Sequence, residues 1–500
     1  MRNSYMLHDN WLMKRAQQTP DALALVFEDR SWTFAALYED ACRYLQALMS
    51  HTADLAPRRM GILANNSDDF YLMILALMQT DVEMVLLNTR LSPEELQYQI
   101  QDAEIEVLIY EGSFTETVSC LQQRAGSALL PLCLEEIRKQ AQEMPVGSGC
   151  GTPTYDLERV MSILYTSGTT GHPKGVMQTY GNHYASALAG ALNTGVVEDD
   201  AWVCTMPLFH ISGLSILIRG LVYGCPVYLL RKFDAERVND LLCSGAGRIV
   251  SVVAYTLAAL LENLGEGSYP PTFRYMLLGG GFFDKGLLQT CAERGIPVIR
   301  SFGMTETCSQ IIATRLSDTE RKPEASGLTL LPNRLRIGEG NLPTGHPGEI
   351  QIQSPALCSG YLNQPEKYAR SFTADGWYKT GDIGLMDSDG YLYVKSRLTD
   401  VIISGGENIY AVEIERCLMT YPGVAEVAVV GHADAQWGYV PWAYLVMEEQ
   451  AARPLPTAQA LVDHCRAHLA GYKIPKRFIY RDALPKTSLG KIQKFKLMDD

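Results

Sequence analysis

Short apolar runs rich in β-branched and aromatic residues alternate along most of the chain with longer stretches whose hydrophobic residues recur at helical spacing. The runs cover residues 60–64, 83–87, 106–110, 161–165, 226–230, 248–253, 274–278 and 297–302. Strands that alternate with helices in this way are typical of mostly parallel sheets whose faces are covered by helices. The pattern therefore predicts an α/β fold.

The pattern changes in the last third of the chain. Residues 327–396 contain short alternating runs with frequent Gly and Pro, such as Gly348–Gln353, which predict antiparallel strands. A strand and helix pattern then returns for about 100 residues, enough for a small domain. We predict a large N-terminal domain over residues 1–399, with a β-rich part at about 327–396. A small mobile α+β domain is expected over residues 400–500.

Composition restricts the class of protein. The chain has 500 residues, of which 47% are hydrophobic and 20% charged, so a disordered or fibrous protein is excluded. Its net charge is −13 without long runs of one sign, which disfavours nucleic acid as a partner. Its 12 cysteines include no C-x-x-C pair, so a zinc ribbon is not expected. The oligomeric state does not follow from the sequence, and a homo-oligomer is compatible with it.

No segment has the pattern expected of an export signal or a membrane span. The N-terminal residues reach Asp9 and Lys14 without a continuous apolar stretch, so we expect no signal peptide. The best membrane candidate, residues 211–230, is interrupted by Arg219 and Pro226, and two short core elements explain it better. We therefore expect a cytoplasmic protein without an integral membrane segment.

A glycine-rich segment follows the run at residues 161–165. It contains flexible glycines, hydroxyl side chains and one cation: Thr166, Ser167, Gly168, Thr169, Thr170, Gly171 and Lys174. Glycines let backbone N–H groups approach an anion, hydroxyls add donors and Lys174 adds charge, so the segment is suited to binding phosphates. It is not a Walker A loop, because Pro173 precedes the lysine and Gly175 follows it.

This segment resembles the signature of the adenylate-forming superfamily, which contains acyl-CoA synthetases, luciferases and the adenylation domains of peptide synthetases. Further motifs resemble those of the family in the family's order: Pro207–His210, Ser301–Thr307, Tyr378–Asp382, Arg397–Asp400 and Pro485–Lys491. The resemblance implies the fold of the superfamily. It also implies a reaction in which a carboxylic acid and ATP, with Mg²⁺, form an acyl adenylate that then reacts with CoA.

One of these motifs and a separate glycine run are expected at a single nucleotide site. The run is Gly279, Gly280 and Gly281, and the motif contains Phe302, Gly303, Met304, Thr305 and Glu306. Both follow predicted parallel strands, and ligands of open α/β sheets bind outside the carboxyl ends of the strands. The resemblance makes this ligand ATP, with Phe302 stacked on adenine and Glu306 holding Mg²⁺ against the phosphates.

The resemblance also implies roles for residues closer to the C-terminus. Asp382 resembles the family carboxylate that accepts both ribose hydroxyls, and Arg397 resembles the arginine that also reaches the ribose. Lys491 resembles the lysine that stabilises charge at the phosphoryl group during adenylation, and Lys486 is its rival for that role. Each assignment depends on the motif around the residue, because a surface salt bridge would explain either ribose residue alone.

The junction between the two predicted domains carries the residues expected to govern domain motion. Asp400 resembles the hinge residue of the family, about which the small domain swings between adenylation and thioester formation. Gly405 and Gly406 would then meet the pantetheine arm of CoA. Ser396 stands where family members often have Gly, a departure that bears on the geometry of the hinge.

The choice of carboxylic acid follows from finer likeness. Four segments look closely like those of the o-succinylbenzoate-CoA ligases of menaquinone biosynthesis: residues 207–215, 277–281, 301–310 and 404–410. Arg219 stands nine residues after His210 in an otherwise apolar stretch, and a buried guanidinium there requires an anionic partner. The succinyl carboxylate would supply that anion and leave the aryl carboxylate to react with ATP, or the two carboxylates would have the reverse roles. His210 would gate or orient the acid, and Ser301 is expected beside it.

Three alternatives remain open from the sequence. An aryl or medium-chain carboxylate-CoA ligase would keep the fold and make Arg219 dispensable. A stand-alone adenylation domain would deliver the acyl group to a carrier protein. A catalytically silent binding homologue is the third, although the presence of Lys174, Glu306 and Lys491 argues against it.

Overall fold

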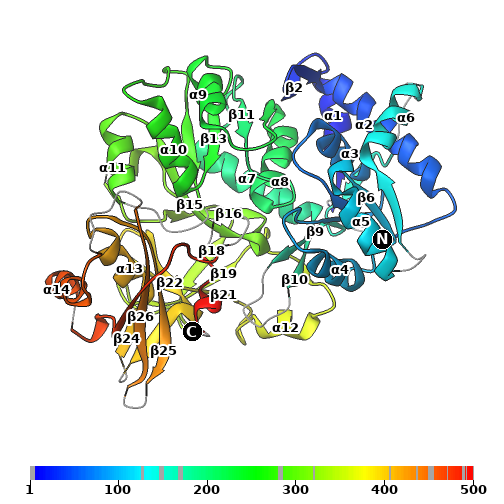
Figure 1. Cartoon of the computed structure of the whole chain (residues 1–500). Helices are drawn as coiled ribbons and strands as arrows, with labels where there is room; N and C mark the ends of the chain where they lie inside the picture. Colours follow the sequence, from blue (N-terminus) through cyan, green and yellow to red (C-terminus); the bar gives the residue numbers. More distant parts are fainter. Residues whose placement is uncertain are drawn as a thin grey trace. The chain divides into compact units, whose positions relative to one another are not determined.

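The computed structural model describes the chain in two compact units (Figure 1). The described residues are 6–125, 129–145, 151–166, 173–279, 285–318, 321–404, 407–434, 437–448, 455–469, 471–486, 490 and 492–498. Unit 1 comprises Met1–Arg334 and Gln353–Gly376, and unit 2 comprises Leu335–Ile352 and Trp377–Asp500. These units are defined by compactness, which does not show where the chain hinges. The domain boundary expected between residues 399 and 400 therefore stays a prediction.

The first large sheet of unit 1 has seven strands. Their order is β20 (Gly360–Tyr361), β10 (Lys174–Thr179), β9 (Val160–Thr166), β5 (Glu83–Leu86), β4 (Arg59–Leu63), β6 (Val107–Tyr110) and β7 (Leu130–Cys133). From β9 to β7 every pair is parallel, whereas β10 is antiparallel to both of its neighbours. The glycine-rich segment therefore joins two antiparallel strands, β9 and β10, at one side of a parallel sheet.

The second large sheet of unit 1 has nine strands. Their order is β17 (Leu328–Thr329), β16 (Ser309–Ala313), β15 (Val298–Met304), β14 (Tyr275–Leu278), β13 (Ile249–Val252), β11 (Trp202–Cys204), β12 (Val227–Leu229), β2 (Leu23–Phe27) and β3 (Arg30–Thr33). The strands from β15 to β2 are parallel, and antiparallel strands flank them. A separate antiparallel pair is formed by β1 (Leu7–Asp9) and β8 (Thr154–Asp156).

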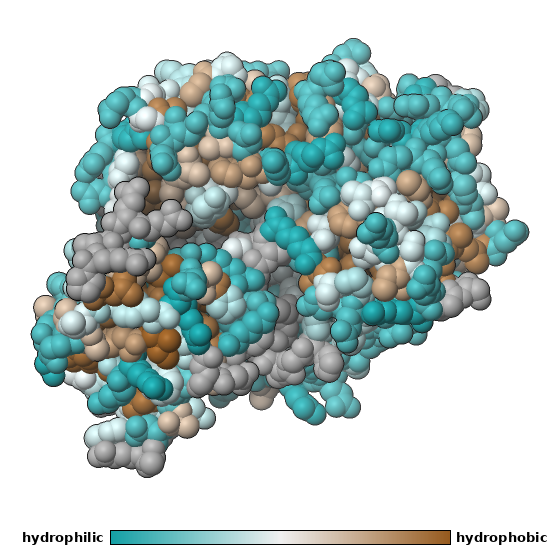
Figure 2. All heavy atoms as spheres, viewed as in Figure 1, coloured by the Kyte–Doolittle hydropathy of each residue, from teal (hydrophilic) through white to brown (hydrophobic). Residues whose placement is uncertain are grey.

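Helices connect and cover these sheets. They are α1 (Trp11–Gln18), α2 (Phe34–Thr52), α3 (Asp68–Leu77), α4 (Pro93–Asp102), α5 (Thr115–Ala125), α6 (Leu134–Glu143), α7 (Tyr180–Thr194), α8 (Ile211–Arg219), α9 (Ala235–Cys243), α10 (Ala254–Leu264), α11 (Lys285–Glu293) and α12 (Pro365–Arg370). The largest core cluster combines residues of α2, α3, α7 and α8 with residues of both large sheets. Figure 2 shows mostly hydrophilic residues on the face in view, with apolar residues in smaller groups among them.

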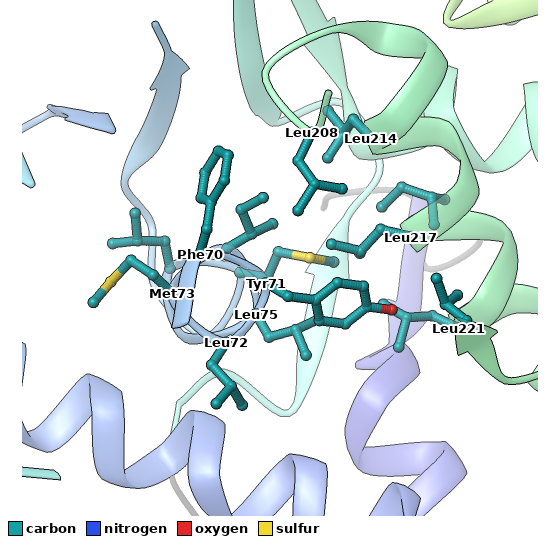
Figure 3. Close-up of a cluster of buried hydrophobic side chains, with 14 of the residues drawn as sticks. Phe70, Tyr71, Leu72, Met73, Leu75, Leu208, Leu214, Leu217 and Leu221 are labelled. Carbon is teal, nitrogen blue, oxygen red and sulfur yellow. The ribbon is translucent and has the colours of Figure 1, made fainter. Parts of the chain in front are cut away.

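Helix α3 explains how this core fixes the position of α8. Every residue of α3 is buried, and after the two aspartates of its first turn the helix is apolar on all sides, as expected of a core helix. The side chain of Ser67 caps its first turn by accepting a hydrogen bond from the backbone N–H of Phe70 at 3.1 Å. In Figure 3, Tyr71 of α3 points toward Leu217 of α8 and Leu221 of the π-helical turn that follows α8. This packing holds α8, and with it Arg219 at its end.

Unit 2 contains two sheets, one of four strands and one of five in which antiparallel and parallel pairs are combined. A four-stranded sheet has the order β18 (Arg334–Ile337), β19 (Gly348–Gln353), β21 (Tyr378–Met386) and β22 (Leu392–Arg397). A five-stranded sheet contains β24 (Glu407–Tyr410), β23 (Val401–Ser404), β26 (Gly438–Met447), β25 (Val424–Asp434) and β27 (Arg477–Tyr480). Two helices accompany it, α13 (Ala411–Met419) and α14 (Ala458–His468).

The structure confirms the predicted α/β class and corrects one detail of the β-rich segment. Each of the eight predicted strand runs contains an observed strand whose ends lie within two residues of the expected ones. Residues 211–230 form α8, a π-helical turn over Gly220–Gly224 and β12. Within the described ranges, no helix is long and apolar enough to cross a membrane. Strand β20, however, joins the first large sheet, because Tyr361 pairs with Val176 of β10.

Candidate active site

A cluster of the half-buried Lys174 with the buried Glu306 and Tyr361 occupies one end of β10. The Lys174 ammonium lies 2.7 Å from Oε1 of Glu306 and donates a hydrogen bond to the Tyr361 hydroxyl at 2.7 Å. That hydroxyl in turn donates to the same Glu306 oxygen at 3.3 Å, and the Lys174 nitrogen lies 4.0 Å from the centre of the Tyr361 ring. The three residues come from β10, the turn after β15 and β20. Sheet pairing therefore gathers them from distant parts of the sequence.

The backbone around Glu306 is held by several hydrogen bonds. Glu306 lies in a short 3-10 helix, Thr305–Thr307, directly after β15, and its side chain is buried. The Thr307 hydroxyl closes the turn by accepting from the backbone N–H of Met304 at 3.0 Å. The Glu306 carbonyl accepts from the backbone N–H of Cys358 at 2.7 Å. These bonds keep the carboxylate facing Lys174.

Electrostatics keep the Lys174 ammonium charged. Burial by itself lowers the pKa of a lysine, because it disfavours the charged form. Here the neighbouring Glu306 and Tyr361 outweigh burial and raise the pKa of Lys174 above its usual value. The site therefore offers a permanent positive charge beside one carboxylate at neutral pH.

The glycine-rich segment begins and ends at this cluster. Thr166 ends β9 and lies opposite Lys174, the first residue of β10, in the antiparallel register. Within the described part of the chain, the buried Thr166 hydroxyl oxygen has no hydrogen-bond partner. Ser167, Gly168, Thr169, Thr170 and Gly171 lie outside the described residues. The two described ends thus present a hydroxyl and an ammonium, both of which suit an anion.

The carboxyl ends of β14 and β15 bring two further predicted residues together. Gly279 follows β14, and the Ser301 hydroxyl in β15 donates to the Leu278 carbonyl at 3.1 Å. A Cβ on Gly279 would lie 3.2 Å from the Ser301 hydroxyl, a tight contact that the glycine avoids. Gly280 and Gly281 lie outside the described residues. This edge is where a ligand of a parallel sheet is expected.

The motif after Ser301 forms the end of β15. Phe302, Met304 and Thr305 are half-buried, and Gly303 is exposed. A Cβ on Gly303 would lie 2.0 Å from the Ser309 carbonyl oxygen of the paired strand β16, so the two backbones approach too closely for any side chain. The close approach of the two strands therefore requires a glycine at position 303, and sequence spacing alone does not show this requirement.

Arg219 is a buried cation at the end of α8. Its residue is 2% exposed, and its guanidinium carbon lies 5.1 Å from the centre of the Trp202 ring. One guanidinium nitrogen donates to the Ser309 hydroxyl at 3.1 Å. No carboxylate of the described residues lies within ion-pair distance of it. A buried guanidinium without an anion is costly, which is a reason to expect that an anionic ligand belongs there.

His210 caps the other end of α8. Its backbone carbonyl accepts from the N–H groups of Gly213 and Leu214, and its ring lies 4.8 Å from that of Phe209. Burial, aided by the charge of Arg90, lowers the pKa of His210 to about 4, so the imidazole is neutral at physiological pH. Its buried Nε2 has no hydrogen-bond partner among the described residues. The ring is thus available to a ligand.

Unit 2 contains the remaining predicted site residues. Asp382 of β21 is buried and lies opposite Arg397 of β22 in the antiparallel register, so the two predicted ribose residues are neighbours. The Asp400 carboxylate forms an ion pair of 3.5 Å with the Lys494 ammonium, which also lies 2.8 Å from the Glu415 carboxylate. Lys486 is paired with Glu426 at 2.6 Å. Gly405, Gly406 and Lys491 lie outside the described residues.

Sequence reasoning did not find several residues of this site. Tyr361 completes the cluster at Lys174, Trp202 lies against Arg219, and Ser309 receives the Arg219 hydrogen bond. The sequence around Trp202 does not mark it as a site residue, because it belongs to a short apolar strand. Ser309 lies two residues after the Ser301–Thr307 motif, so the motif itself pointed to this neighbourhood.

Comparison with known proteins establishes the family. The model of the family described as AMP-binding enzyme matches residues 12–362, and the model of its C-terminal domain matches residues 413–491. The chain belongs to the AMP-binding enzyme family. Among AMP-binding enzymes, the 2-succinylbenzoate–CoA ligase of Enterococcus faecalis is 41% identical over 98% of both chains.

Solved structures of AMP-binding enzymes agree over the whole chain. The o-succinylbenzoate CoA synthetase of Bacillus subtilis in complex with its acyl-adenylate intermediate is 37% identical, covers 99% of each chain and superposes with a TM-score of 0.91. The same enzyme in complex with ATP and a magnesium ion is 36% identical, with 99% of this chain and 100% of that chain covered and a TM-score of 0.90.

Proposed function

We propose that this protein joins o-succinylbenzoate to CoA through an acyl-adenylate intermediate, with release of AMP and pyrophosphate, in menaquinone biosynthesis. Full-length similarity to 2-succinylbenzoate–CoA ligases supports the reaction class and the acid. The single observation that carries the choice of acid is the buried Arg219, which has no anionic partner among the described residues. We expect the reaction to take place in the cytoplasm.

The first half-reaction forms the adenylate. A carboxylate oxygen of the acid attacks the α-phosphorus of ATP, so that a new P–O bond forms and the bond to pyrophosphate breaks. Lys174, Thr166 and residues 167–171 would bind the phosphates, and Lys491 would stabilise the charge that develops on the phosphoryl oxygens. Because that charge is larger in the transition state than in bound ATP, this interaction raises the rate and not only the affinity.

The nucleoside would be held by residues from several motifs in the second half of the chain. Phe302 would stack on adenine beside the run Gly279–Gly281, and the backbone of Gly303, Met304 and Thr305 would lie near the nucleotide. Asp382 would accept the ribose hydroxyls, with Arg397 as the second ribose contact. The support for these roles is the order of the motifs, the neighbouring register of Asp382 and Arg397, and family membership.

Glu306 fits a magnesium ligand. Within the described residues, no group of three or more His, Cys, Asp and Glu side chains could hold a metal by itself. Mg²⁺ is usually held by one or two carboxylates together with the phosphates of a substrate, and a single buried carboxylate beside a phosphate-binding lysine suits that arrangement. When bound, Mg²⁺ neutralises charge on the phosphates during the displacement.

The acid would lie along α8. One carboxylate of the acid, succinyl or aryl, would pair with Arg219, leaving the other free to attack ATP. His210, neutral at physiological pH, would contact the acid through its Nε2, and Ser301 would line the same edge of the sheet. A neutral imidazole does not compete with Arg219 for the negative charge, so the acid is oriented by one cation.

The second half-reaction would use another arrangement of the domains. The CoA thiolate attacks the acyl carbon, so that a C–S bond forms and the C–O bond to AMP breaks, while the thiol proton passes to solvent. We propose that residues 400–500 swing relative to residues 1–399 about Asp400 between the two steps. Gly405 and Gly406 would then contact the pantetheine arm.

A panel of acids tests this function. The purified protein would be incubated with ATP and Mg²⁺ and, in turn, o-succinylbenzoate, benzoate, octanoate or malonate, and pyrophosphate release would be measured before and after CoA is added. Selective turnover of o-succinylbenzoate is expected. Preference for benzoate or octanoate would replace the proposal with an aryl or medium-chain ligase. An acid that releases pyrophosphate but yields no CoA thioester would favour delivery to a carrier protein.

A further inference from the structure

A chain of buried polar side chains leads from α7 to the turn that carries Glu306. His183 Nε2 lies 2.8 Å from the Ser162 hydroxyl, which donates to Oε1 of Gln178 at 2.9 Å. The amide nitrogen of Gln178 then donates to the backbone carbonyl of Thr305 at 2.5 Å. Ser162 and Gln178 are opposite each other in the register of β9 and β10, and all three side chains are buried.

The chemistry of the groups fixes the direction of every hydrogen bond in this chain. The Thr305 carbonyl can only accept, so the NH₂ group of Gln178 faces it and the amide oxygen faces Ser162. The Ser162 hydroxyl must then donate to that oxygen and accept from His183. Burial lowers the pKa of His183 to about 3, so the ring is neutral. Because the Ser162 hydroxyl must accept from this ring, the hydrogen-bond chain assigns the ring proton to Nε2. One arrangement of protons satisfies the whole chain.

The presence of these hydrogen-bonded polar side chains in the core requires an explanation. A buried polar group costs stability unless it is fully hydrogen-bonded, and apolar side chains would fill the same space at lower risk. Gln178 and Lys174 lie four residues apart in β10, so both side chains point to the same face of the strand. Lys174 contacts the carboxylate of Glu306, and Gln178 contacts the carbonyl of the preceding residue. One strand therefore holds this turn at its side chain and at its backbone.

We infer that Gln178, oriented by Ser162 and His183, is a positioning residue that fixes the Thr305–Glu306 turn for binding of the magnesium–ATP complex. The inference rests on the proposed function, because adenylation is the step that uses this turn. Loss of the Gln178 donor leaves the Thr305 carbonyl buried without its partner and lets the peptide rotate. The Glu306 carboxylate then meets the metal and phosphates in more than one orientation.

The variant Gln178→Met tests this directly, because methionine has a similar shape and no donor. Adenylation should slow by about tenfold to a hundredfold, the range for a misplacement of about 1 Å near the reacting groups. The Mg²⁺ concentration for half-maximal rate should rise. Thioester formation from added acyl adenylate and CoA should slow much less, since that step binds no magnesium–ATP and uses the turn only for contacts to the AMP group. A purely structural role would slow both half-reactions equally, and that result would overturn the inference.

Three further variants keep the test informative. Ser162→Ala removes the link between His183 and Gln178 with little change of volume, and it should give a smaller loss in the same half-reaction. Combined with Gln178→Met, it should add almost nothing, because both act through one chain. Gln97→Met is the matched control, since Gln97 is a buried glutamine of α4 whose amide has no partner among the described residues. Fully additive losses, or an equal loss in the control, would contradict the inference.

A binding measurement separates this inference from the proposed function. Titration of the magnesium–ATP complex into the protein without any acid should show weaker binding for Gln178→Met than for the unmodified protein or Gln97→Met. If the unmodified protein adenylates none of the acids, the proposed function fails while this comparison still stands. If the unmodified protein is active and Gln178→Met binds and adenylates equally well, only the inference fails.

Discussion

The Lys174 ammonium and the Glu306 carboxylate form a largely buried ion pair of 2.7 Å between the first residue of β10 and the turn after β15. Without nucleotide, each group neutralises the other. We propose that an incoming triphosphate would offer Lys174 a more highly charged partner and would leave the Glu306 carboxylate for Mg²⁺. On this proposal, the pair keeps both charges in place until the nucleotide replaces the contact.

The variant Lys174→Met should weaken the binding of ATP more than the binding of the acid. It removes the cation and leaves Glu306 buried without its partner, and breaking one side of a buried charge pair costs about 2 to 5 kcal/mol. We expect the KM for ATP to rise by at least about tenfold, with a smaller change in the KM for the acid. Steady-state kinetics with each substrate varied in turn would show this. An unchanged KM for ATP would remove Lys174 from the phosphate site.

The variant Arg219→Met should affect the acid and leave ATP alone. Loss of a buried charge contact to one carboxylate of the acid should raise the KM for o-succinylbenzoate by about a hundredfold. Benzoate, which lacks the tail, should react as poorly with the variant as with the unmodified enzyme. Arg231→Met serves as the control, because Arg231 is half exposed and pairs only loosely with Glu28 and Glu111. Equal kinetics for the two variants would exclude the assignment of Arg219.

Lys494 should support adenylation from a distance. It joins Asp400, the proposed hinge residue, to Glu415, and it lies three residues after Lys491. Lys494→Met would loosen the segment that carries Lys491, so adenylation should slow by about fivefold, the upper end for a partly exposed ion pair. Thioester formation should change less. Measuring the half-reactions separately, with Arg466→Met of the surface pair with Asp463 as the control, would detect the difference.

Two buried histidines should make the protein less stable in mild acid. The folded-state pKa of His183 is about 3 and that of His210 about 4, both below the usual 6.5. Between pH 6.5 and 4 the unfolded chain therefore binds more protons, and stability falls as pH falls. From pH 7 to 5.5 the loss should be about 1 kcal/mol for each histidine.

Urea unfolding at the two pH values would measure this loss. The variant His183→Gln cannot take up the proton, so its unfolding midpoint should shift less between pH 7 and 5.5 than that of the unmodified protein. His346→Gln should shift as much as the unmodified protein, because His346 is exposed. An identical shift in the unmodified protein and in His183→Gln would contradict the burial argument.

Local patterns predicted the strands and the motifs, and long-range pairing produced what they missed. The alternation of strands and helices depends on residues that are close in sequence, so the ends of β4, β5, β6 and β9 were predicted to within two residues. Tyr361 reaches Lys174 across 187 positions, because β20 leaves the β-rich segment and pairs with β10. No local pattern encodes that pairing.

Side-chain chemistry showed the same limit. The sequence identified Arg219 as a cation in an apolar stretch, and the structure adds Trp202 and Ser309 as its neighbours. Gln178 went unnoticed, because one polar residue at the end of a strand is ordinary. It becomes meaningful only when the register of β9 and β10 sets it opposite Ser162. Lys491, Gly405 and Gly406 lie outside the described residues, and their roles stay predictions.

Transfer of a carboxylate oxygen to AMP tests the account most directly. The acid would be labelled with ¹⁸O in its carboxylates and converted to the CoA thioester with ATP and Mg²⁺. The masses of AMP and pyrophosphate would then be measured by mass spectrometry. Attack of the carboxylate on the α-phosphorus, followed by cleavage of the acyl C–O bond by CoA, puts one labelled oxygen into each AMP and none into pyrophosphate. Unlabelled AMP, or label in pyrophosphate or phosphate, would contradict the acyl-adenylate route.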